Sequence, residues 1–151
     1  MKKMNANLDI AIRASITAGN EIMNVYNSEF DYEIKEDNSP LTEADKKAND
    51  IINSFLIPTE IPIISEESKQ LPYAERVGWK HCWIVDPLDG TSNFLRGLPF
   101  FSISIALVEA GVPIAGVVYN PMSEELFTAH KGSGAFLNDK RIRVGNKTSV
   151  A

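Results

Sequence analysis

Hydrophobic residues recur at helical spacing in two early segments of the chain. One segment covers residues 8–26 and the other residues 44–56, just after Thr42. In both, apolar side chains return every three or four positions, which is typical of a helix with one buried face. The positions are Leu8, Ala11, Ile12, Ile16, Gly19, Ile22, Met23 and Tyr26 in the first, and Ala44, Ala48, Ile51, Ile52, Phe55 and Leu56 in the second. The pattern predicts two amphipathic helices, the second starting at Thr42.

Shorter segments alternate between apolar and polar residues or form brief apolar runs, which indicates strands. They cover residues 30–34, 61–64, 82–85, 101–107, 114–119, 125–129, 135–137 and 141–144. Most of the later strands are separated only by short turns, such as residues 109–111 and 138–140, so we expect an antiparallel sheet. The predicted fold class is therefore α+β, with two amino-terminal helices packed on an antiparallel sheet.

The segments between and within the predicted strands add further expectations. Asp37-Asn38-Ser39-Pro40 predicts a loop, and a polar segment through Arg76 precedes the strand at residues 82–85. In the strand at residues 101–107, large apolar residues alternate with small ones, namely Ser102, Ser104 and Ala106. We expect these small residues to let a helix pack closely.

Composition narrows the class of protein. The chain has 151 residues, 44% hydrophobic and 23% charged, which fits one soluble domain with a real core. Its net charge of −5 argues against a general nucleic-acid or membrane-surface binder. The single Cys82 allows no internal disulfide, and charged residues interrupt any signal-peptide core after Lys2 and Lys3. No segment approaches the length of a membrane span. We expect a cytoplasmic protein.

The segment Trp83-Ile84-Val85-Asp86-Pro87-Leu88-Asp89-Gly90-Thr91 carries the most chemistry. Pro87 cannot donate to a sheet ladder, so we expect the strand to end there. Gly90 allows a sharp turn, and Thr91 can cap a short helix through residues 93–95. Two carboxylates beside a helix start could hold divalent cations and a phosphate. Alternatively, Asp-Gly is a common hairpin turn with no further role.

Further acids lie at the ends of other predicted elements. Asp45 lies in the first turn of the second helix, and Glu66 and Glu67 follow a strand. Each has a simpler interpretation, because Thr42 and Asp45 form a capping-box pattern and the glutamates could lie in a solvated loop. Hard cations such as Mg²⁺, however, need carboxylate oxygens gathered from separate segments.

The residue patterns that several other kinds of active site require are absent from the sequence. Neither His81 nor His130 has metal-ligand spacing to a partner, which argues against zinc. The chain has no Gly-x-Ser-x-Gly elbow, P-loop or dinucleotide fingerprint. Metal-assisted hydrolysis of a phosphate ester is the chemistry that remains.

Asp86-Pro87-Leu88-Asp89-Gly90-Thr91, with Glu66-Glu67 upstream, resembles the signature of the inositol monophosphatase superfamily. The resemblance covers essentially the whole chain and implies a Mg²⁺-dependent phosphatase with the first half of a layered α/β sandwich. It implies that Glu66, Asp86, Asp89 and the main-chain carbonyl of Leu88 bind two or three Mg²⁺ ions, with Asp86 bridging two. The implied catalytic residues are Asp45, Thr91 and Glu66, of which Asp45 and Thr91 orient the attacking water. The phosphate would lie against Gly90, Thr91 and Ser92, and Glu67 would support the site.

The chain departs from this superfamily in length. Its members are longer, and their second half supplies a further aspartate ligand and most substrate contacts. We therefore expect residues 1–151 to form an amino-terminal metal- and phosphate-binding domain without the carboxy-terminal domain. Such a domain would have an exposed face, weak metal binding, poor or no catalysis on its own and some tendency to self-associate. It could also be a non-catalytic module that binds a partner chain, and a homodimer is a further expectation.

The substrate motifs point in two directions. Ser39-Pro40-Leu41-Thr42-Glu43-Ala44-Asp45, Ser65-Glu66-Glu67-Ser68 and Pro72-Tyr73-Ala74-Glu75-Arg76 resemble the 3′(2′),5′-bisphosphate nucleotidase branch. Thr91-Ser92-Asn93-Phe94, Gly97-Leu98-Pro99, Gly116-Val117-Val118-Tyr119-Asn120-Pro121 and Gly134-Ala135-Phe136-Leu137-Asn138 resemble the inositol monophosphatase branch. We favour a small phosphorylated polyol such as inositol monophosphate, because residues just after the phosphate turn lie nearest the substrate. Adenosine 3′,5′-bisphosphate is the alternative.

Overall fold

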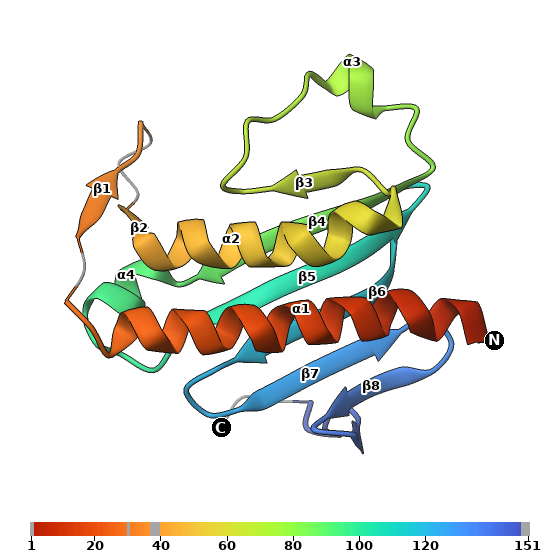
Figure 1. Ribbon diagram of the computed structural model, residues 1–151. Helices are drawn as coiled ribbons and strands as arrows, with labels where there is room; N and C mark the ends of the chain where they lie inside the picture. Colours follow the sequence, from red (N-terminus) through yellow and green to blue (C-terminus); the bar gives the residue numbers. More distant parts are fainter. Residues whose placement is uncertain (1, 30, 37–39, 149–151) are drawn as a thin grey trace.

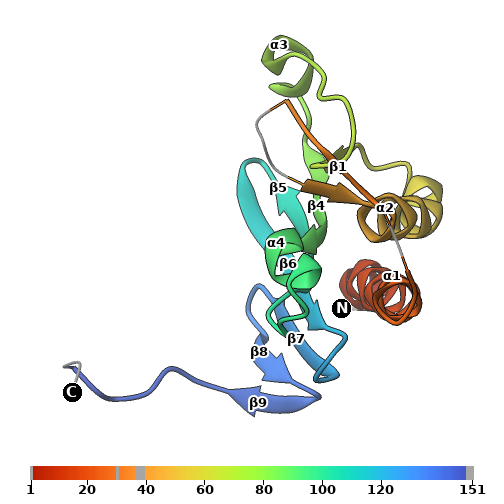
Figure 2. The same cartoon turned by 90° about the vertical axis from the view of Figure 1, so that its left-hand side faces the viewer.

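The protein is described by a computed structural model that covers residues 2–29, 31–36 and 40–148. Two long helices lie side by side on one face of a sheet (Figures 1 and 2). The helices are α1 Lys2–Tyr26, α2 Glu43–Leu56, the 3₁₀ helix η1 Ile57–Thr59, α3 Tyr73–Arg76 and α4 Thr91–Leu95. The strands are β1 Tyr32–Ile34, β2 Pro40–Thr42, β3 Ile63–Ser65, β4 His81–Asp89, β5 Ser102–Glu109, β6 Val112–Asn120, β7 Glu125–His130, β8 Gly134–Leu137 and β9 Lys140–Ile142. The predicted α+β class, with two amino-terminal helices on a sheet, is confirmed.

The main sheet has seven strands in the order β3-β4-β5-β6-β7-β8-β9. From β4 to β9 each strand is antiparallel to the next, as the short turns predicted. β3 is the exception, because it runs parallel to β4 with Ile63 opposite Trp83. A parallel pair needs a long crossover, and the segment between β3 and β4, which includes α3, provides it. The sheet is therefore mixed and not purely antiparallel.

The two faces of the sheet differ in what covers them. Along β5, Ile103, Ile105 and Leu107 are buried and belong to the core with α1 and α2. Ser104 and Ala106 point to the opposite face, so the helices pack on the large residues, contrary to the expectation from the small ones. Figure 2 shows both long helices on one side of the sheet.

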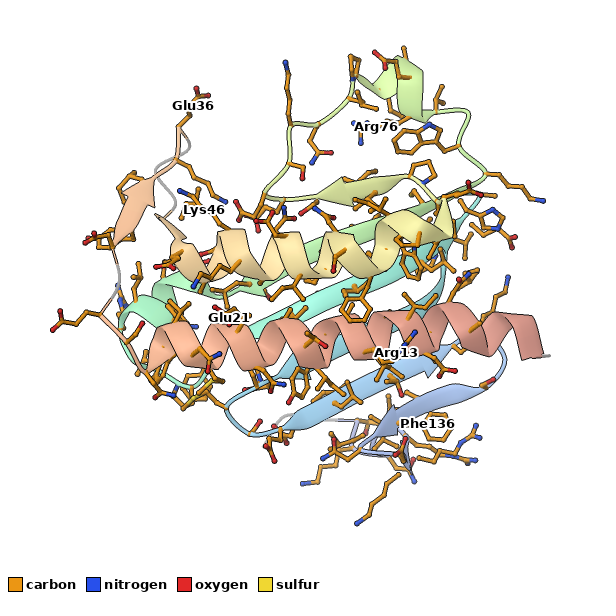
Figure 3. The ribbon with its side chains drawn as sticks, viewed as in Figure 1. Arg13, Glu21, Glu36, Lys46, Arg76 and Phe136 are labelled. Carbon is orange, nitrogen blue, oxygen red and sulfur yellow. The ribbon has the colours of Figure 1, made fainter. Side chains whose placement is uncertain are left out.

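The opposite face of the sheet is open. It contains a hollow of about 620 Å³, and its apolar side chains are substantially exposed. Ile84, Val118, Phe127 and Ile142 are 45%, 42%, 38% and 37% exposed. Figure 3 labels Phe136, which lines the same hollow. The sheet therefore has an exposed apolar face on the side opposite α1 and α2.

Close contacts hold α1 and α2 to each other and to the sheet. Alanines fill the interface between them, including Ala14, Ala18 and Ala48, which are fully buried. The ammonium group of Lys47 on α2 lies 2.9 Å from the carboxylate of Glu21, which Figure 3 labels on α1. Where α1 crosses β6, a Cβ at Gly19 would lie only 2.6 Å from the Tyr119 ring. The small residues of α1 therefore allow its close approach.

Several element boundaries differ from the predicted ones. α1 begins at Lys2, earlier than predicted, whereas α2 begins directly after Thr42 as predicted. Residue 30 and residues 37–39 of the predicted strand and loop lie outside the described residues, but Pro40 pairs with Ile34 in a two-stranded ribbon. The polar segment contains the short helix α3. No helix in the described part of the chain is both long and apolar enough to cross a membrane.

Candidate metal and phosphate site

The strand β4 carries two acids on its last residues and does not end at Pro87 as expected. Asp86 pairs with Ser104 and Asp89 with Ser102, with an irregularity between the two pairs. The two acids are three positions apart on β4, while their partners are two positions apart on β5. One extra residue on β4 is a β-bulge, which brings side chains to the same face that would otherwise alternate. Pro87 lies within this bulge, where its missing N–H breaks no regular pair.

The turn from β4 into α4 is made by Gly90. Its φ is 86°, and it is the N-cap of α4, so Thr91 is the first residue of the helix and not its cap as expected. The backbone N–H groups of Asn93 and Phe94 donate to the Gly90 carbonyl at 2.9 and 3.0 Å. A Cβ on residue 90 would lie 2.6 Å from the Phe100 carbonyl oxygen, so only glycine fits here.

Asp45 is both a helix cap and a part of this turn. It is buried, and its Oδ2 accepts hydrogen bonds from the Thr42 hydroxyl and, at 2.8 Å, from the Thr42 N–H. Its Oδ1 lies 3.0 Å from the Thr91 hydroxyl. That hydroxyl is also 3.0 Å from the Leu88 carbonyl oxygen, so its one proton is shared between two acceptors. The capping-box interpretation of Asp45 is therefore correct. Asp45 also contacts Thr91 of the predicted site.

Glu66 and Glu67 leave β3 next to the β4 acids. The Glu66 N–H donates to the Val85 carbonyl at 3.1 Å, which places Glu66 beside Asp86. The Glu67 side chain is 6% exposed, and its Oε1 lies 2.8 Å from the Lys35 ammonium group, which is also 3.6 Å from Glu66 Oε1. Burial raises the pKa of Glu67, and the hydrogen bond and charge of Lys35 oppose that rise. No local pattern in the sequence indicated Lys35, because it comes from the separate β1–β2 ribbon.

These elements together surround a hollow of about 240 Å³. Its lining contains seven of the predicted site residues together with Asn93, which sequence reasoning had not assigned to the site. The lining residues are Glu66, Asp86, Leu88, Asp89, Gly90, Thr91, Ser92 and Asn93. Asp45 reaches this group through Thr91, whereas Glu67 lies behind Glu66 and contacts Lys35.

The acids in the hollow repel one another. Burial, together with the charge and hydrogen bond of Glu66 and the charge of Asp89, raises the pKa of Asp86 to about 7, although the Leu88 N–H partly opposes this. Among the described residues, no three acids, histidines or cysteines are close enough together to form a ready metal cluster. The hollow therefore concentrates negative charge that a bound cation would compensate.

The sequence model of the inositol monophosphatase family matches residues 4–151 of this chain. The chain belongs to the inositol monophosphatase family. The resemblance inferred from the Asp86–Thr91 motif and the Glu66-Glu67 pair is therefore confirmed.

Relatives in this family have several different names. The Nus factor SuhB of Pasteurella multocida is 43% identical over 152 residues, covering 98% of this chain and 56% of that protein. The 3′(2′),5′-bisphosphate nucleotidase CysQ of Buchnera aphidicola is 42% identical over 126 residues, covering 81% of this chain and 47% of that protein. The chain thus spans about half the length of the curated relatives it matches.

Solved structures of the family share the fold. An IMPase from Thermotoga maritima matches with a TM-score of 0.86 and 35% identity, over 96% of this chain and 56% of that chain. An IMPase/NADP phosphatase in complex with Mg²⁺ and phosphate matches with a TM-score of 0.73 and 27% identity, over 83% of this chain and 48% of that chain. The chain therefore has the α+β fold of these phosphatase structures over about half of their length.

Proposed function

We propose that this chain carries the metal- and phosphate-binding site of a Mg²⁺-dependent phosphomonoesterase that hydrolyses small phosphorylated polyols such as inositol monophosphate. The observation that supports this most strongly is the bulge in β4. It directs Asp86 and Asp89 into one hollow with Glu66, at the turn where α4 begins. Membership of the inositol monophosphatase family supports phosphatase chemistry.

The donor set of the hollow suits Mg²⁺. The carboxylates of Glu66, Asp86 and Asp89 and the carbonyl of Leu88 all offer oxygen, which hard divalent cations prefer. Their mutual repulsion, seen in the raised pKa of Asp86, is what a bound cation would relieve. When bound, Mg²⁺ lowers the pKa of a coordinated water and neutralises charge on the phosphoryl group. We infer that these four residues hold two or three ions.

The remaining site residues orient the reactants. The Thr91 hydroxyl is fixed by Asp45 Oδ1 and the Leu88 carbonyl, so its oxygen is held in place to accept a hydrogen bond from the attacking water. Asp45 keeps this arrangement because Thr42 binds its other oxygen. The phosphate would contact Gly90, Thr91 and Ser92, which line the hollow at the start of α4. Glu67 supports Glu66 through their shared contact with Lys35.

Substrate choice rests on the residues next to the phosphate turn. Ser92 and Asn93 line the hollow, and they match the inositol monophosphatase branch. The similarity to CysQ of Buchnera aphidicola supports adenosine 3′,5′-bisphosphate as the alternative substrate. Because the relatives are about twice as long as this chain, we propose that residues 1–151 are an amino-terminal metal- and phosphate-binding domain. A module that binds a partner chain without turnover is the remaining alternative.

Phosphate release at saturating Mg²⁺ from inositol 1-phosphate and from adenosine 3′,5′-bisphosphate tests this proposal. We expect faster release from inositol 1-phosphate, and we expect Asp89→Asn to abolish most of it. Asp50→Asn, at an exposed position on α2, is the matched control and should retain full activity. Preference for the adenosine compound would favour the nucleotidase alternative. Mg²⁺ binding without release from either substrate would favour the non-catalytic module.

A further inference from the structure

The helix α2 contacts both acid-bearing segments of the site through two polar side chains one helical turn apart. Asp45 is 1% exposed and Asn49 is 9% exposed, and both belong to the buried face of the helix. Asp45 accepts a hydrogen bond from Thr91 at the start of α4. Asn49 Oδ1 accepts a hydrogen bond of 2.6 Å from the Ser65 hydroxyl at the end of β3. One rigid helix therefore connects the two segments that carry the site acids.

Ser65 links this contact directly to the glutamates. It is the last residue of β3, it is fully buried, and it pairs with Val85 of β4. Its hydroxyl donates to Asn49 and accepts the N–H of Glu67 at 3.3 Å. The residue between them is Glu66, whose own N–H is held by the Val85 carbonyl. The backbone on both sides of Glu66 is thus fixed by hydrogen bonds.

Most of the buried neighbours of Asn49 on α2 are apolar. They are Ala48 and Ile52, with Asp45 one turn away as the polar exception. Apolar residues could fill the positions of Asn49 and Ser65, but the Glu67 N–H would then lose its hydrogen bond to the Ser65 hydroxyl. A satisfied buried hydrogen bond instead specifies one arrangement of helix and strand. Its position, directly before the glutamates, indicates that the arrangement it fixes is that of the site.

We propose that Asn49 and Ser65 are positioning residues that set the place of Glu66 relative to Asp86, with α2 as the rigid spacer. This inference rests on the proposed function, since Glu66 and Asp86 are its metal ligands. Groups that orient metal ligands from behind typically change metal affinity by about 10–100-fold when they are removed. Asn49 acts through Ser65 and touches neither metal nor substrate.

The test is calorimetric titration of Mg²⁺ into the 151-residue chain and its variants, with urea unfolding to confirm that each is folded. We expect Asn49→Ala and Ser65→Ala each to weaken Mg²⁺ binding about tenfold. Because one residue acts through the other, the double variant should bind no more weakly than Ser65→Ala alone. Two matched controls remove similar groups elsewhere. Ser15→Ala deletes a buried hydroxyl that donates to Ala11, and Asn53→Ala deletes an amide on α2 whose Oδ1 has no hydrogen-bond partner among the described residues.

The outcomes separate this inference from the proposed function. If Asp86→Asn loses Mg²⁺ binding while Asn49→Ala and Ser65→Ala bind within about twofold of the two controls, well short of the expected loss, the positioning role is wrong and the proposed function stands. If the two losses add fully in the double variant, Asn49 does not act through Ser65. If the parent binds Mg²⁺ no better than Asp86→Asn, both proposals fail. Asn49→Ala decides the question alone if Ser65→Ala does not fold.

Discussion

Replacing Gly90 with alanine should be unusually costly, for two separate reasons. Gly90 has a φ of 86°, and a Cβ there would lie 2.6 Å from the Phe100 carbonyl oxygen and 3.3 Å from the Phe101 Cα. A left-handed backbone costs an L-residue about 1–2 kcal/mol. Forcing an extra carbon into a packed site typically costs about 1–3 kcal/mol. The sum is about 2–5 kcal/mol, and the obstacle is backbone that cannot simply rotate away.

Substitutions at other glycines measure the backbone cost and the packing cost separately. Gly111 has a φ of 79° with nothing within 4 Å of the position that a Cβ would take, so Gly111→Ala should lose only the backbone contribution of about 1–2 kcal/mol. Gly19 has a helical backbone but a crowded Cβ position, so Gly19→Ala should show the packing cost, reduced by about 1 kcal/mol of helix propensity. Gly78 has neither problem, and Gly78→Ala should change stability by less than about 1 kcal/mol.

Urea unfolding followed by circular dichroism measures all four variants on one scale. We expect Gly90→Ala to have the largest loss and to exceed Gly111→Ala by at least about 1 kcal/mol. Equal losses for these two variants would show that the Phe100 carbonyl can move aside freely. The close approach of the turn to the segment just before β5 would then play no part in fixing the site.

Three further predictions concern other parts of the structure. Without metal and at about pH 8, Asp86→Asn should raise the urea midpoint, because it removes a carboxylate whose pKa is raised to about 7 by burial and by neighbouring acids. The same substitution should abolish stabilisation by Mg²⁺. A lower midpoint would contradict the repulsion described above. Thr42→Ala should lose about 1–2 kcal/mol of stability with its capping box, and Thr42→Ser should recover most of it in the same assay. Val117→Ala, at a site 1% exposed on the helix-covered face, should lose about 2 kcal/mol, whereas Val118→Ala, 42% exposed on the open face, should lose less than half as much.

Periodicity was sufficient to predict the long helices and most strands of the main sheet, but not their mutual arrangement. The two helices and the strands of the meander follow from local alternation, and the turn through Asn138 and Asp139 has the left-handed backbone that such a hairpin needs. The parallel pairing of β3 depends on where a long crossover returns the chain, and no local pattern records that. The strand β4 also continues through Pro87, because a bulge accommodates a residue that lacks an N–H.

Most residues of the candidate site could be named from the sequence, but their contacts could not. Asp45, Glu66, Asp86 and Asp89 lie at element ends, which local patterns locate. Lys35, in contrast, reaches Glu67 from a ribbon far away in the sequence, and its role depends on a tertiary contact. The same is true of Asn49, which looks like any polar residue on a helix until its bond to Ser65 is seen.

The hollow lined by Glu66, Asp86 and Asp89 contains an arrangement that destabilises the fold locally. Three carboxylates face one small volume, one of them half-buried with a raised pKa, and this arrangement costs folding free energy. Such a cost persists only where the surrounding structure enforces it. Here the enforcement comes from the β4 bulge, the glycine turn and the two bonds of α2 to Thr91 and Ser65. These features have no evident use in a chain that merely needs a turn, so their concentration around one hollow argues for a site that binds cations.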